Sequence, residues 1–364
     1  MTMTERVAMT SRRRFLVLAG TVLALSVTTG VQFVTPAQSL PARLSDREFW
    51  RLVTESSEPN GFFRSDNLLS NELGFQQVIP ELARRALPGR VYMGVGPEQN
   101  FTYIAATRPA MVFIVDIRRG NLDLHLMYKA LFELSADRAE FVSRLFSKMR
   151  PAGLTAKSTA AEIFGAFADV PASRRLFDDN LKAIDSLLVR KRGLALSGDD
   201  VAGIRHVYNA FYSYGQRIQY SSTSSFAGSF QPDYAELMTA SDGEGVARSY
   251  LANEDHFRFL KSLEERNLLV PVVGNFGGRK AIRAVGRYLR ERNATVSAFY
   301  LSNVEQYLRQ EGMWDDFCAN VATLPLDDTS TFIRSVRRPG GTAPGFGLAS
   351  ELGSMMTDVQ SCRT

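Results

Sequence analysis

Residues 90–121 constrain the fold more than any other part of the chain, because they predict a strand, a glycine turn, a helix and a second strand in succession. The β-prone run 90–93 stops at Gly94 and Gly96, where the missing Cβ atoms let the backbone turn sharply and approach a ligand. Residues 100–106 follow a helical pattern, which Pro109 ends. A chain with this pattern is expected to build a sheet whose strands alternate with helices.

The second strand of this segment ends in an acid. Residues 111–115 are a continuous apolar run, typical of a strand buried on both faces of a parallel sheet, and Asp116 follows directly. In Rossmann-like domains, an acid about 20 residues after the glycine turn binds a pair of ribose hydroxyl groups. We therefore predict a nucleotide or nucleoside site with these cofactor-binding residues: Gly94, Gly96, Asn100, Asp116 and Arg118. In the alternative interpretation, the glycines form only a tight turn and Asp116 caps a helix.

A departure from the dinucleotide-binding fingerprint limits which cofactor is expected. Gln99 occupies the place of the third glycine in G-x-G-x-x-G, so the helix start is not shaped for a pyrophosphate, which argues against NAD and FAD. The segment is more similar to the first motif of class I S-adenosylmethionine (SAM) methyltransferases, in which a strand enters a G-x-G turn and a later acid binds the ribose. Tyr92 stands where that family usually carries an acid for the methionine amine, and Glu98 is a candidate to supply this carboxylate from the other side of the turn.

The sheet pattern returns later in the chain. Residues 268–273, 295–301 and 331–336 are predicted strands, and residues 279–292 between the first two are a predicted helix. This alternation favours an α/β fold with a Rossmann-like, doubly wound and mainly parallel sheet. Ligands of such sheets bind at the carboxyl ends of the strands, where four predicted positions converge: Gly94, Asp116, Asn275 and the pair Ser302 and Asn303.

Residues 134–266 are predicted to form a helical lobe inserted into the Rossmann-like domain, which comprises residues 43–133 and 267–340. Pro171 is expected to open one helix of the lobe, and Ser197 is expected to cap another that runs to residue 212. Residues 217–231 are predicted to form a loop or a short extended segment. The nearby aromatic side chains at helical spacing are interpreted as packing rather than a ligand box: Tyr208, Phe211, Tyr212 and Tyr214. Residues 341–364 are left as a C-terminal tail.

Residues 65–72, before the first strand, are unusually polar for a segment so close to Phe75. They contain Ser and Asn residues and two acids, and two interpretations are open. Ser70 caps a helix that runs to Ala86, with the acids near its positive end. Alternatively, the segment folds over the glycine turn and closes the ligand site.

The amino terminus predicts export. Arg12 and Arg13 begin a basic run that matches the twin-arginine pattern, and the apolar residues 15–27 follow. An apolar run of about 13 residues is short of the roughly 20 needed to span a bilayer, so we expect residues 1–42 to be a cleaved signal peptide. The protein is then periplasmic or secreted, and it contacts a membrane only during export. This route carries proteins that are already folded, often with a ligand bound.

Composition indicates an ordinary globular protein after cleavage. The formal charge is +5, and residues 1–42 contribute +3 of it (four Arg and one Glu), so about +2 remains (5 − 3), which does not imply a nucleic-acid partner. Cys318 and Cys362 are the only cysteines, and an oxidising compartment permits them to pair without requiring it. The three histidines, His125, His206 and His256, are scattered, so no metal site is expected.

Three blocks of the sequence resemble a known family. GVGPEQNFTYI (94–104), FIVDIRRGN (113–121) and FYLSNVEQYL (299–308) are similar to the hallmark segments of an uncharacterised bacterial family, which is described by its resemblance to SAM-dependent methyltransferases. The similarity covers most of residues 60–336. It implies that Gly94, Gly96 and Asp116 face the cofactor, and that Ser302 and Asn303 follow a strand beside the transferred group.

The leading hypothesis is a SAM-binding, methyltransferase-like protein whose acceptor is not predicted. Methyl transfer requires mainly alignment, for which Asn303, Glu305 and Tyr307 are the candidate catalytic residues. Because SAM is made inside the cell, an exported enzyme has no obvious supply, and the alternative is a Rossmann-like binding protein for a nucleoside-like or envelope-derived ligand without turnover. A periplasmic hydrolase that uses Ser302 and His125 is disfavoured, because residues 300–304 lack the G-x-S-x-G elbow.

Overall fold

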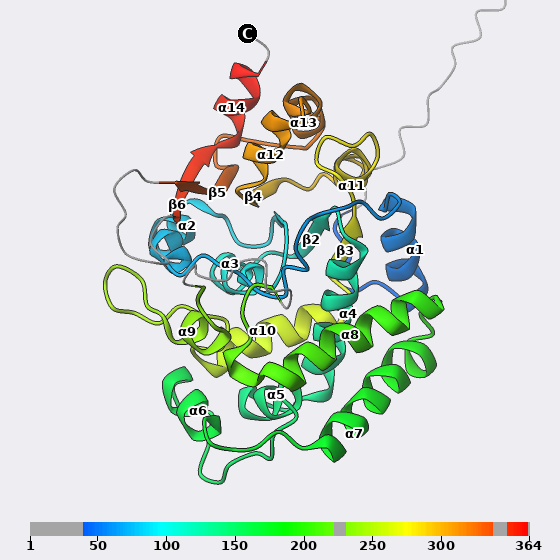
Figure 1. Cartoon of the computed structure of the whole chain (residues 1–364). Coiled ribbons are helices and arrows are strands. Elements are labelled where there is room, and N and C mark those ends of the chain that lie inside the picture. Colours follow the sequence, from blue (N-terminus) through cyan, green and yellow to red (C-terminus); the bar gives the residue numbers. More distant parts are fainter. Residues whose placement is uncertain (1–38, 222–230, 338–347, 363–364) are drawn as a thin grey trace, which may run out of the picture. The chain divides into compact units, whose positions relative to one another are not determined.

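A computed structural model describes residues 39–221, 231–337 and 348–362 (Figure 1). Most of the predicted signal peptide therefore lies outside the described residues. No helix in the described part is long and apolar enough to cross a membrane.

The centre of the fold is a six-stranded sheet with the order β3-β2-β1-β4-β5-β6. Neighbouring strands from β3 to β5 pair in parallel, and β6 pairs antiparallel with β5 at the edge. The strands have these bounds: β1 Val91–Gly94, β2 Met111–Asp116, β3 Leu269–Val273, β4 Val296–Ser302, β5 Thr331–Arg337 and β6 Leu348–Ser354. The predicted α/β class with a mainly parallel sheet is confirmed.

Burial explains why β1, β2, β3 and β4 are mostly apolar. Every residue of β1, β2 and β3 is buried, as are the first six residues of β4. A parallel strand covered on both faces has no solvent side on which to place polar residues, so its sequence does not alternate. The four strands predicted from such runs begin and end within two residues of their observed bounds.

Helices cover the sheet and fill the long interval between β2 and β3. The described α-helices are α1 Asp46–Ser56, α2 Ile79–Arg85, α3 Gln99–Thr107, α4 Arg119–Leu134, α5 Arg138–Leu145, α6 Ala160–Phe167, α7 Arg174–Asp185, α8 Gly198–Tyr214, α9 Tyr234–Thr239, α10 Glu254–Glu265, α11 Ala281–Arg290, α12 Val304–Gln310, α13 Trp314–Val321 and α14 Met355–Ser361. Short 3-10 turns span Phe75–Val78 and Gly215–Arg217, and a π-helical turn spans Ser186–Lys191.

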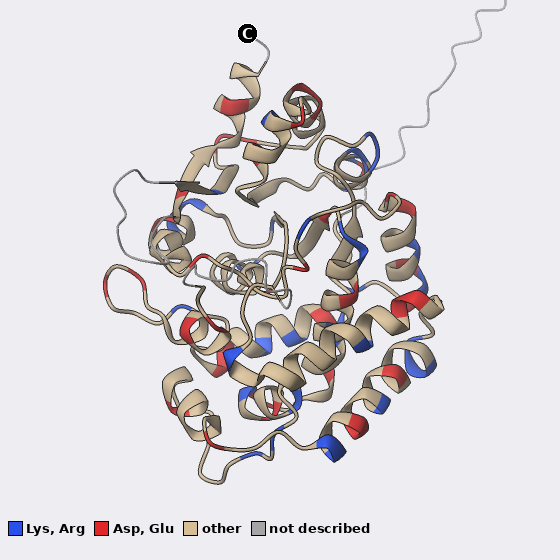
Figure 2. Cartoon of the chain, in the orientation of Figure 1, with Lys and Arg blue, Asp and Glu red and all other residues tan. Residues whose placement is uncertain are grey.

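The interval between β2 and β3 is helical in its described part. Helix α4 packs against β2 and β3, and α5, α7, α8 and α10 pack in turn against α4. In Figure 1, α5 to α9 (green) lie together at the bottom of the view. Figure 2 shows basic (blue) and acidic (red) positions following one another along the ribbon of α7, where Arg174 pairs with Asp178.

Several details of this interval test the sequence analysis. Ser197 caps α8 with a capping box, as predicted. The helix expected to open at Pro171 begins instead at Arg174, because the side chain of Ser173 provides the cap. Tyr208 is buried and stacks on Phe177 with ring centroids 5.1 Å apart, which confirms its role in packing.

The rest of the predicted aromatic cluster is divided between core and surface. Phe211 is buried, whereas Tyr214 is 52% exposed. Most of the predicted loop 217–231 lies outside the described residues, and Arg217 belongs to the preceding 3-10 turn.

The predicted carboxyl-terminal tail contains a strand and a helix. Residues 348–354 form β6, and residues 355–361 form α14. A disulfide joins Cys318 of α13 to Cys362, directly after α14. Arg334 of β5 forms ion pairs with Glu305 of α12 and with Asp358 of α14. These links fasten the last strand and helix to the edge of the sheet.

Candidate functional site

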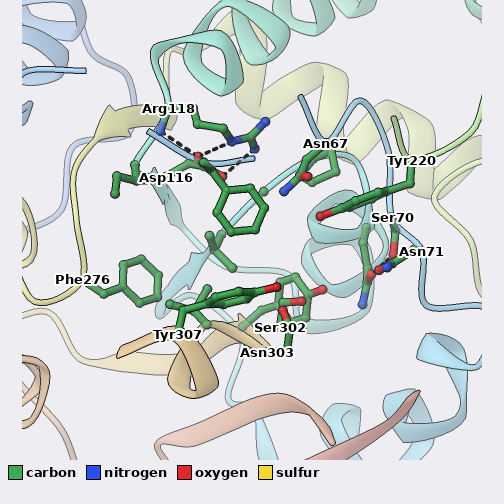
Figure 3. A pocket seen from close by; sticks show the side chains of 18 of the residues that line it. Asn67, Ser70, Asn71, Asp116, Arg118, Tyr220, Phe276, Ser302, Asn303 and Tyr307 are labelled. Atoms are coloured by element: carbon green, nitrogen blue, oxygen red, sulfur yellow. Dashed lines mark hydrogen bonds and ion pairs between the residues drawn. The ribbon is translucent and has the colours of Figure 1, made fainter. Parts of the chain in front are cut away.

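A cavity of about 440 Å³ lies at the carboxyl ends of β1, β2, β3 and β4 (Figure 3). Each strand contributes the residues at which it ends or the turn that follows it: Val95 to Pro97 after β1, Asp116 to Arg118 at β2, Gly274 to Phe276 after β3, and Ser302 to Val304 at β4. The segment before β1 closes another side with Phe62, Phe63, Asn67, Ser70, Asn71 and Glu72. The predicted convergence of the strand ends is thus observed.

The glycine turn after β1 is held from inside the protein. Asn100 Nδ2 donates to the carbonyl oxygens of Val95 (2.9 Å), Gly96 (3.2 Å) and Pro97 (2.7 Å). The nitrogen His125 Nε2 lies 2.9 Å from the Gly96 oxygen and must donate to it, since a carbonyl only accepts. Burial lowers the pKa of His125 to about 4, so the ring is neutral. Gly96 has a φ of 77°, which suits glycine.

Two predicted cofactor-binding residues shape this turn instead of lining the cavity. A Cβ atom on Gly94 would overlap Asn100 Oδ1, so the glycine lets the amide approach the strand. Asn100 is itself fully buried, and its Oδ1 accepts from the Tyr92 hydroxyl at 2.9 Å. Neither Gly94 nor Asn100 is among the residues that line the cavity, whereas Gly96 is.

Asp116 and Arg118 form a closed ion pair in the cavity wall. Arg118 Nε donates to Asp116 Oδ1 (3.0 Å), and a terminal nitrogen donates to Oδ2 (2.9 Å). The Arg118 backbone N–H also donates to Oδ1, at 2.9 Å. The remaining terminal nitrogen of Arg118 donates to the Asp66 carbonyl oxygen. Both residues line the cavity as predicted, but the guanidinium binds Asp116 rather than facing the cavity alone (Figure 3).

Glu98 does not supply a carboxylate to the cavity. It is fully buried beneath the turn, its Oε1 accepts from the Ser70 N–H at 3.2 Å, and its Oε2 has no partner among the described residues. Burial, reinforced by the nearby Glu72 carboxylate, raises the pKa of Glu98 to about 8. This environment corrects the prediction that Glu98 replaces the acid missing at Tyr92.

Glu305 is also not in the cavity wall. Its carboxylate accepts from Arg334 at 2.7 and 3.1 Å, and it therefore ties α12 to β5. The prediction that Glu305 orients an acceptor is corrected, because the ion pair turns its side chain to a structural partner.

Asn303 and Tyr307 remain as the predicted residues of α12 that line the cavity. Asn303 is the first flanking residue of α12, but its side chain makes no capping hydrogen bond. Tyr307 packs edge-on against Phe63 with ring centroids 5.3 Å apart, and its hydroxyl accepts from Arg64 at 3.1 Å. Figure 3 shows Asn303 and Tyr307 on the same side of the cavity, opposite Asp116.

Ser302 and Asn275 also line the cavity as predicted. The Ser302 hydroxyl donates to Glu72 Oε1 at 2.7 Å, and it does not pair with His125. Asn275 accepts from the Gly277 N–H at 3.0 Å and so shapes the turn after β3.

Glu72 is a polar residue of the cavity wall that was not among the predicted site residues. It lines the cavity and is 2% exposed, and its carboxylate accepts from the hydroxyls of Tyr300 (2.8 Å) and Ser302 (2.7 Å) and from Gln99 Nε2 (2.9 Å). The available signal was the polar run 65–72 beside Phe75.

The run 65–72 folds against the glycine turn. The Ser70 N–H donates to Glu98, the Ser70 hydroxyl donates to Gln99, and Glu72 accepts from Gln99. These contacts agree with the interpretation in which the segment closes the site. Ser70 is not a helix cap, because the next helical turn begins only at Phe75 and Ser70 is engaged elsewhere.

Within residues 39–221, 231–337 and 348–362, no group of three His, Cys, Asp or Glu side chains is placed to hold a metal ion.

The comparisons with known proteins identify a family without a known function. A family model described as "Domain of unknown function (DUF7790)" matches residues 68–351. The matched range contains β1 to β5 and the cavity residues Glu72, Gly96, Asp116 and Ser302. A comparison with curated proteins gives no match.

Proposed function

The chain belongs to the DUF7790 family, and we propose that it is a SAM-binding, methyltransferase-like protein with a Rossmann-like fold. The observation that carries the proposal is that the glycine turn after β1 and the acid at the end of β2 line one cavity at the strand ends. The predicted methyltransferase motif consists of these two features.

The strand order supports the Rossmann-like part of the proposal. The doubly wound fold has the order 3-2-1-4-5-6, in which the chain first moves outward from β1 through β2 and β3 and then returns to the other side of β1. Here the same order occurs, with β6 antiparallel. Ligands of such sheets bind where the order reverses, between β1 and its neighbour β4, and the cavity lies at the carboxyl ends of those strands.

The size and lining of the cavity suit a small-molecule ligand whose reaction mainly requires correct positioning. Ligand pockets commonly enclose about 300–1,000 Å³ and are lined by apolar and aromatic side chains with a few polar groups. Gly96 and Asp116 would face the nucleoside part of SAM, and Asn303 and Tyr307 would orient the group near the methyl donor. A sulfonium is already activated, so positioning supplies most of the catalysis.

The geometry at Asp116 sets a condition on the ribose. Three hydrogen bonds from Arg118 occupy three of the roughly four acceptor positions of an ionised carboxylate. A ribose diol would therefore use the remaining position on Asp116 or displace the Arg118 side chain.

A second candidate function is binding without turnover, of a nucleoside-like or envelope-derived ligand. The position of Glu305 favours it, because pairing with Arg334 removes the one predicted catalytic residue with a carboxylate from the cavity. The difficulty of supplying SAM outside the cytoplasm points the same way.

Export through the twin-arginine route remains part of the proposal. The Cys318–Cys362 disulfide supports it, because structural disulfides persist in oxidising compartments such as the periplasm.

Calorimetry with SAM, S-adenosylhomocysteine and adenosine tests the proposed function. The matched variant is Asp116→Asn/Arg118→Gln, because a single replacement would leave one buried charge unpaired. Loss of hydrogen bonds to a charged acceptor costs roughly 1.5–3 kcal/mol, so affinity should fall about ten-fold to a hundred-fold. Asp178→Asn, in an ion pair on α7, is the control and should bind as the parent does.

If the parent binds none of the three compounds, the adenosine-based proposal is rejected. Equal affinity of the parent and the double variant would remove Asp116 from the site.

A further inference from the structure

The cavity wall contains a buried acid that has no cationic partner among the described residues. Glu72 is almost fully buried there, and its three hydrogen-bond donors, Gln99, Tyr300 and Ser302, are all uncharged. It forms no ion pair with the described residues. The other buried acid of the wall, Asp116, is neutralised by Arg118. The buried part of the wall therefore keeps one carboxylate without a basic partner.

A buried carboxylate without a cation is costly, and stability alone does not explain it. Protein interiors normally pair such a group, as this chain does for Asp116 with Arg118 and for Glu305 with Arg334. Glu72, in contrast, has no cationic partner among the described residues and lines a cavity. A ligand with a positive charge would supply the missing partner.

The residue that donates to Glu72 from the end of β4 has an unusual backbone conformation. Ser302 has a φ of 50°, which residues with a side chain rarely adopt, and it follows a shift in the pairing register between β4 and β5. This conformation accompanies the 2.7 Å hydrogen bond from its hydroxyl to Glu72. Strained residues of this kind persist where the surrounding structure holds them, and they cluster at functional sites.

A second acceptor without a partner among the described residues lies in the same segment. Asn67 lines the cavity, and its buried Oδ1 has no hydrogen-bond partner among the described residues. Asn67 also has a positive φ, of 43°. Glu72 and Asn67 therefore present acceptors, which complement a group that carries N–H donors.

Aromatic rings complete the environment that suits a cation. Tyr220, Tyr300 and Tyr307 line the cavity, and the electron-rich faces of such rings attract positive groups. The ring of Tyr307 already has the Arg64 guanidinium 5.8 Å from its centroid.

We propose that the cavity selects ligands with an organic ammonium group, and that Glu72 is the residue which recognises this group. The proposal concerns the charge of the ligand and does not require its adenosine part, so it goes beyond the function proposed above. Asn67 would accept a further N–H of the same group.

The test compares tyramine with 2-(4-hydroxyphenyl)ethanol, which carries a hydroxyl in place of the ammonium, by calorimetry on the full mature protein. The parent should bind tyramine at least ten-fold more tightly. Glu72→Gln keeps the shape and removes the charge, so it should weaken tyramine binding about ten-fold to a hundred-fold and leave the neutral compound within about two-fold. Glu81→Gln, on the exposed face of α2, is the charge-matched control and should change neither affinity.

Equal affinity of the parent for the two compounds, including no binding of either, would overturn the proposal, as would an unchanged preference in Glu72→Gln. If that variant does not fold, Asn67→Ala provides the second test, and it should weaken binding of tyramine but not of the alcohol. Preference for tyramine together with no binding of adenosine or SAM would reject the proposed function and retain this one.

Discussion

At the scale of single residues, burial and partners decide what each acid near the cavity can do. Asp116 is buried but paired with Arg118, Glu98 is buried beneath the glycine turn with one free oxygen, and Glu72 is buried against uncharged donors. Their positions in the sequence do not distinguish them, since all three follow or precede apolar segments. Asp116 and Arg118, both predicted to bind the cofactor, therefore bind each other in this structure.

Glu98 should make stability depend on pH. Burial raises its pKa from 4.5 to about 8, so the folded protein holds this proton more tightly than the unfolded chain. The contribution is fully present below the unfolded value and is lost as the pH rises through about 8. The free energy of unfolding of the parent should therefore fall between pH 5 and pH 8. The fall in Glu98→Gln should be smaller, and the difference between the two falls should be about 2–5 kcal/mol.

Urea denaturation at pH 5, 6.5 and 8 measures this difference. Glu81→Gln is the control, since the pKa of Glu81 is lowered by its hydrogen bond to Arg85 and contributes no loss in this window. Identical pH slopes for the parent and Glu98→Gln would show that Glu98 is ionised in the folded protein.

Among the helices, the residue before the first turn either caps the helix or lines the cavity. Ser197 donates and accepts in a complete capping box at the start of α8. Asn303 occupies the corresponding place before α12, yet it makes no capping bond and lines the cavity. Two polar residues at the same kind of position, Ser197 and Asn303, thus serve different purposes: one caps its helix and the other lines the cavity.

Two alanine variants should separate these purposes. Ser197→Ala should lower the free energy of unfolding by about 1 kcal/mol, because a capping bond is lost, and should leave ligand affinity unchanged. Asn303→Ala should change the free energy of unfolding by only a few tenths of a kcal/mol. It should lower the affinity for the ligand that the parent binds. Calorimetry and urea denaturation on both variants provide the measurement. A stability loss without an affinity change in Asn303→Ala would assign this segment to the scaffold.

At the scale of the whole molecule, the cavity is assembled from segments that lie far apart in the chain. Glu72 and Tyr300 are separated by 228 positions and are joined by a hydrogen bond across the cavity floor. Leu348, at the start of β6, also lines the cavity, and β6 is followed by the helix that the disulfide ties to α13. Ligand binding is therefore expected to depend on the fold of the carboxyl-terminal strand and helix.

Export and the disulfide should be linked. Replacing Arg12 and Arg13 by Lys should leave the precursor in the cytoplasm with Cys318 and Cys362 reduced, whereas the exported parent should have them joined. Loss of a cross-link over 44 residues should cost about 2–4 kcal/mol of stability. Cell fractionation, thiol alkylation with mass measurement and urea denaturation test the three parts. Unchanged periplasmic yield of the double Lys protein would reject the twin-arginine assignment.

The mainly parallel core and the strand ends that meet at the cavity could be predicted from the amino-acid sequence. Continuous apolar runs marked β2 and β3, because strands covered on both faces cannot alternate with polar residues, and β1, β4 and β5 were predicted from segments that also contain polar residues. The glycine turn and Asp116 followed from the local geometry that such turns require. These signals lie within short stretches of chain, where hydrophobic pattern and backbone freedom are sufficient.

Which polar groups meet could not be predicted, because it depends on how distant segments pack. The Glu72 bonds to Tyr300 and Ser302, the pairing of Glu305 with Arg334 and the burial of Glu98 depend on packing between distant segments. Strand β6 was missed for a related reason: as an edge strand with mixed exposure, it lacks the apolar run that marks the core. A buried polar group must find its partner wherever the fold places one, and local pattern carries no record of that place.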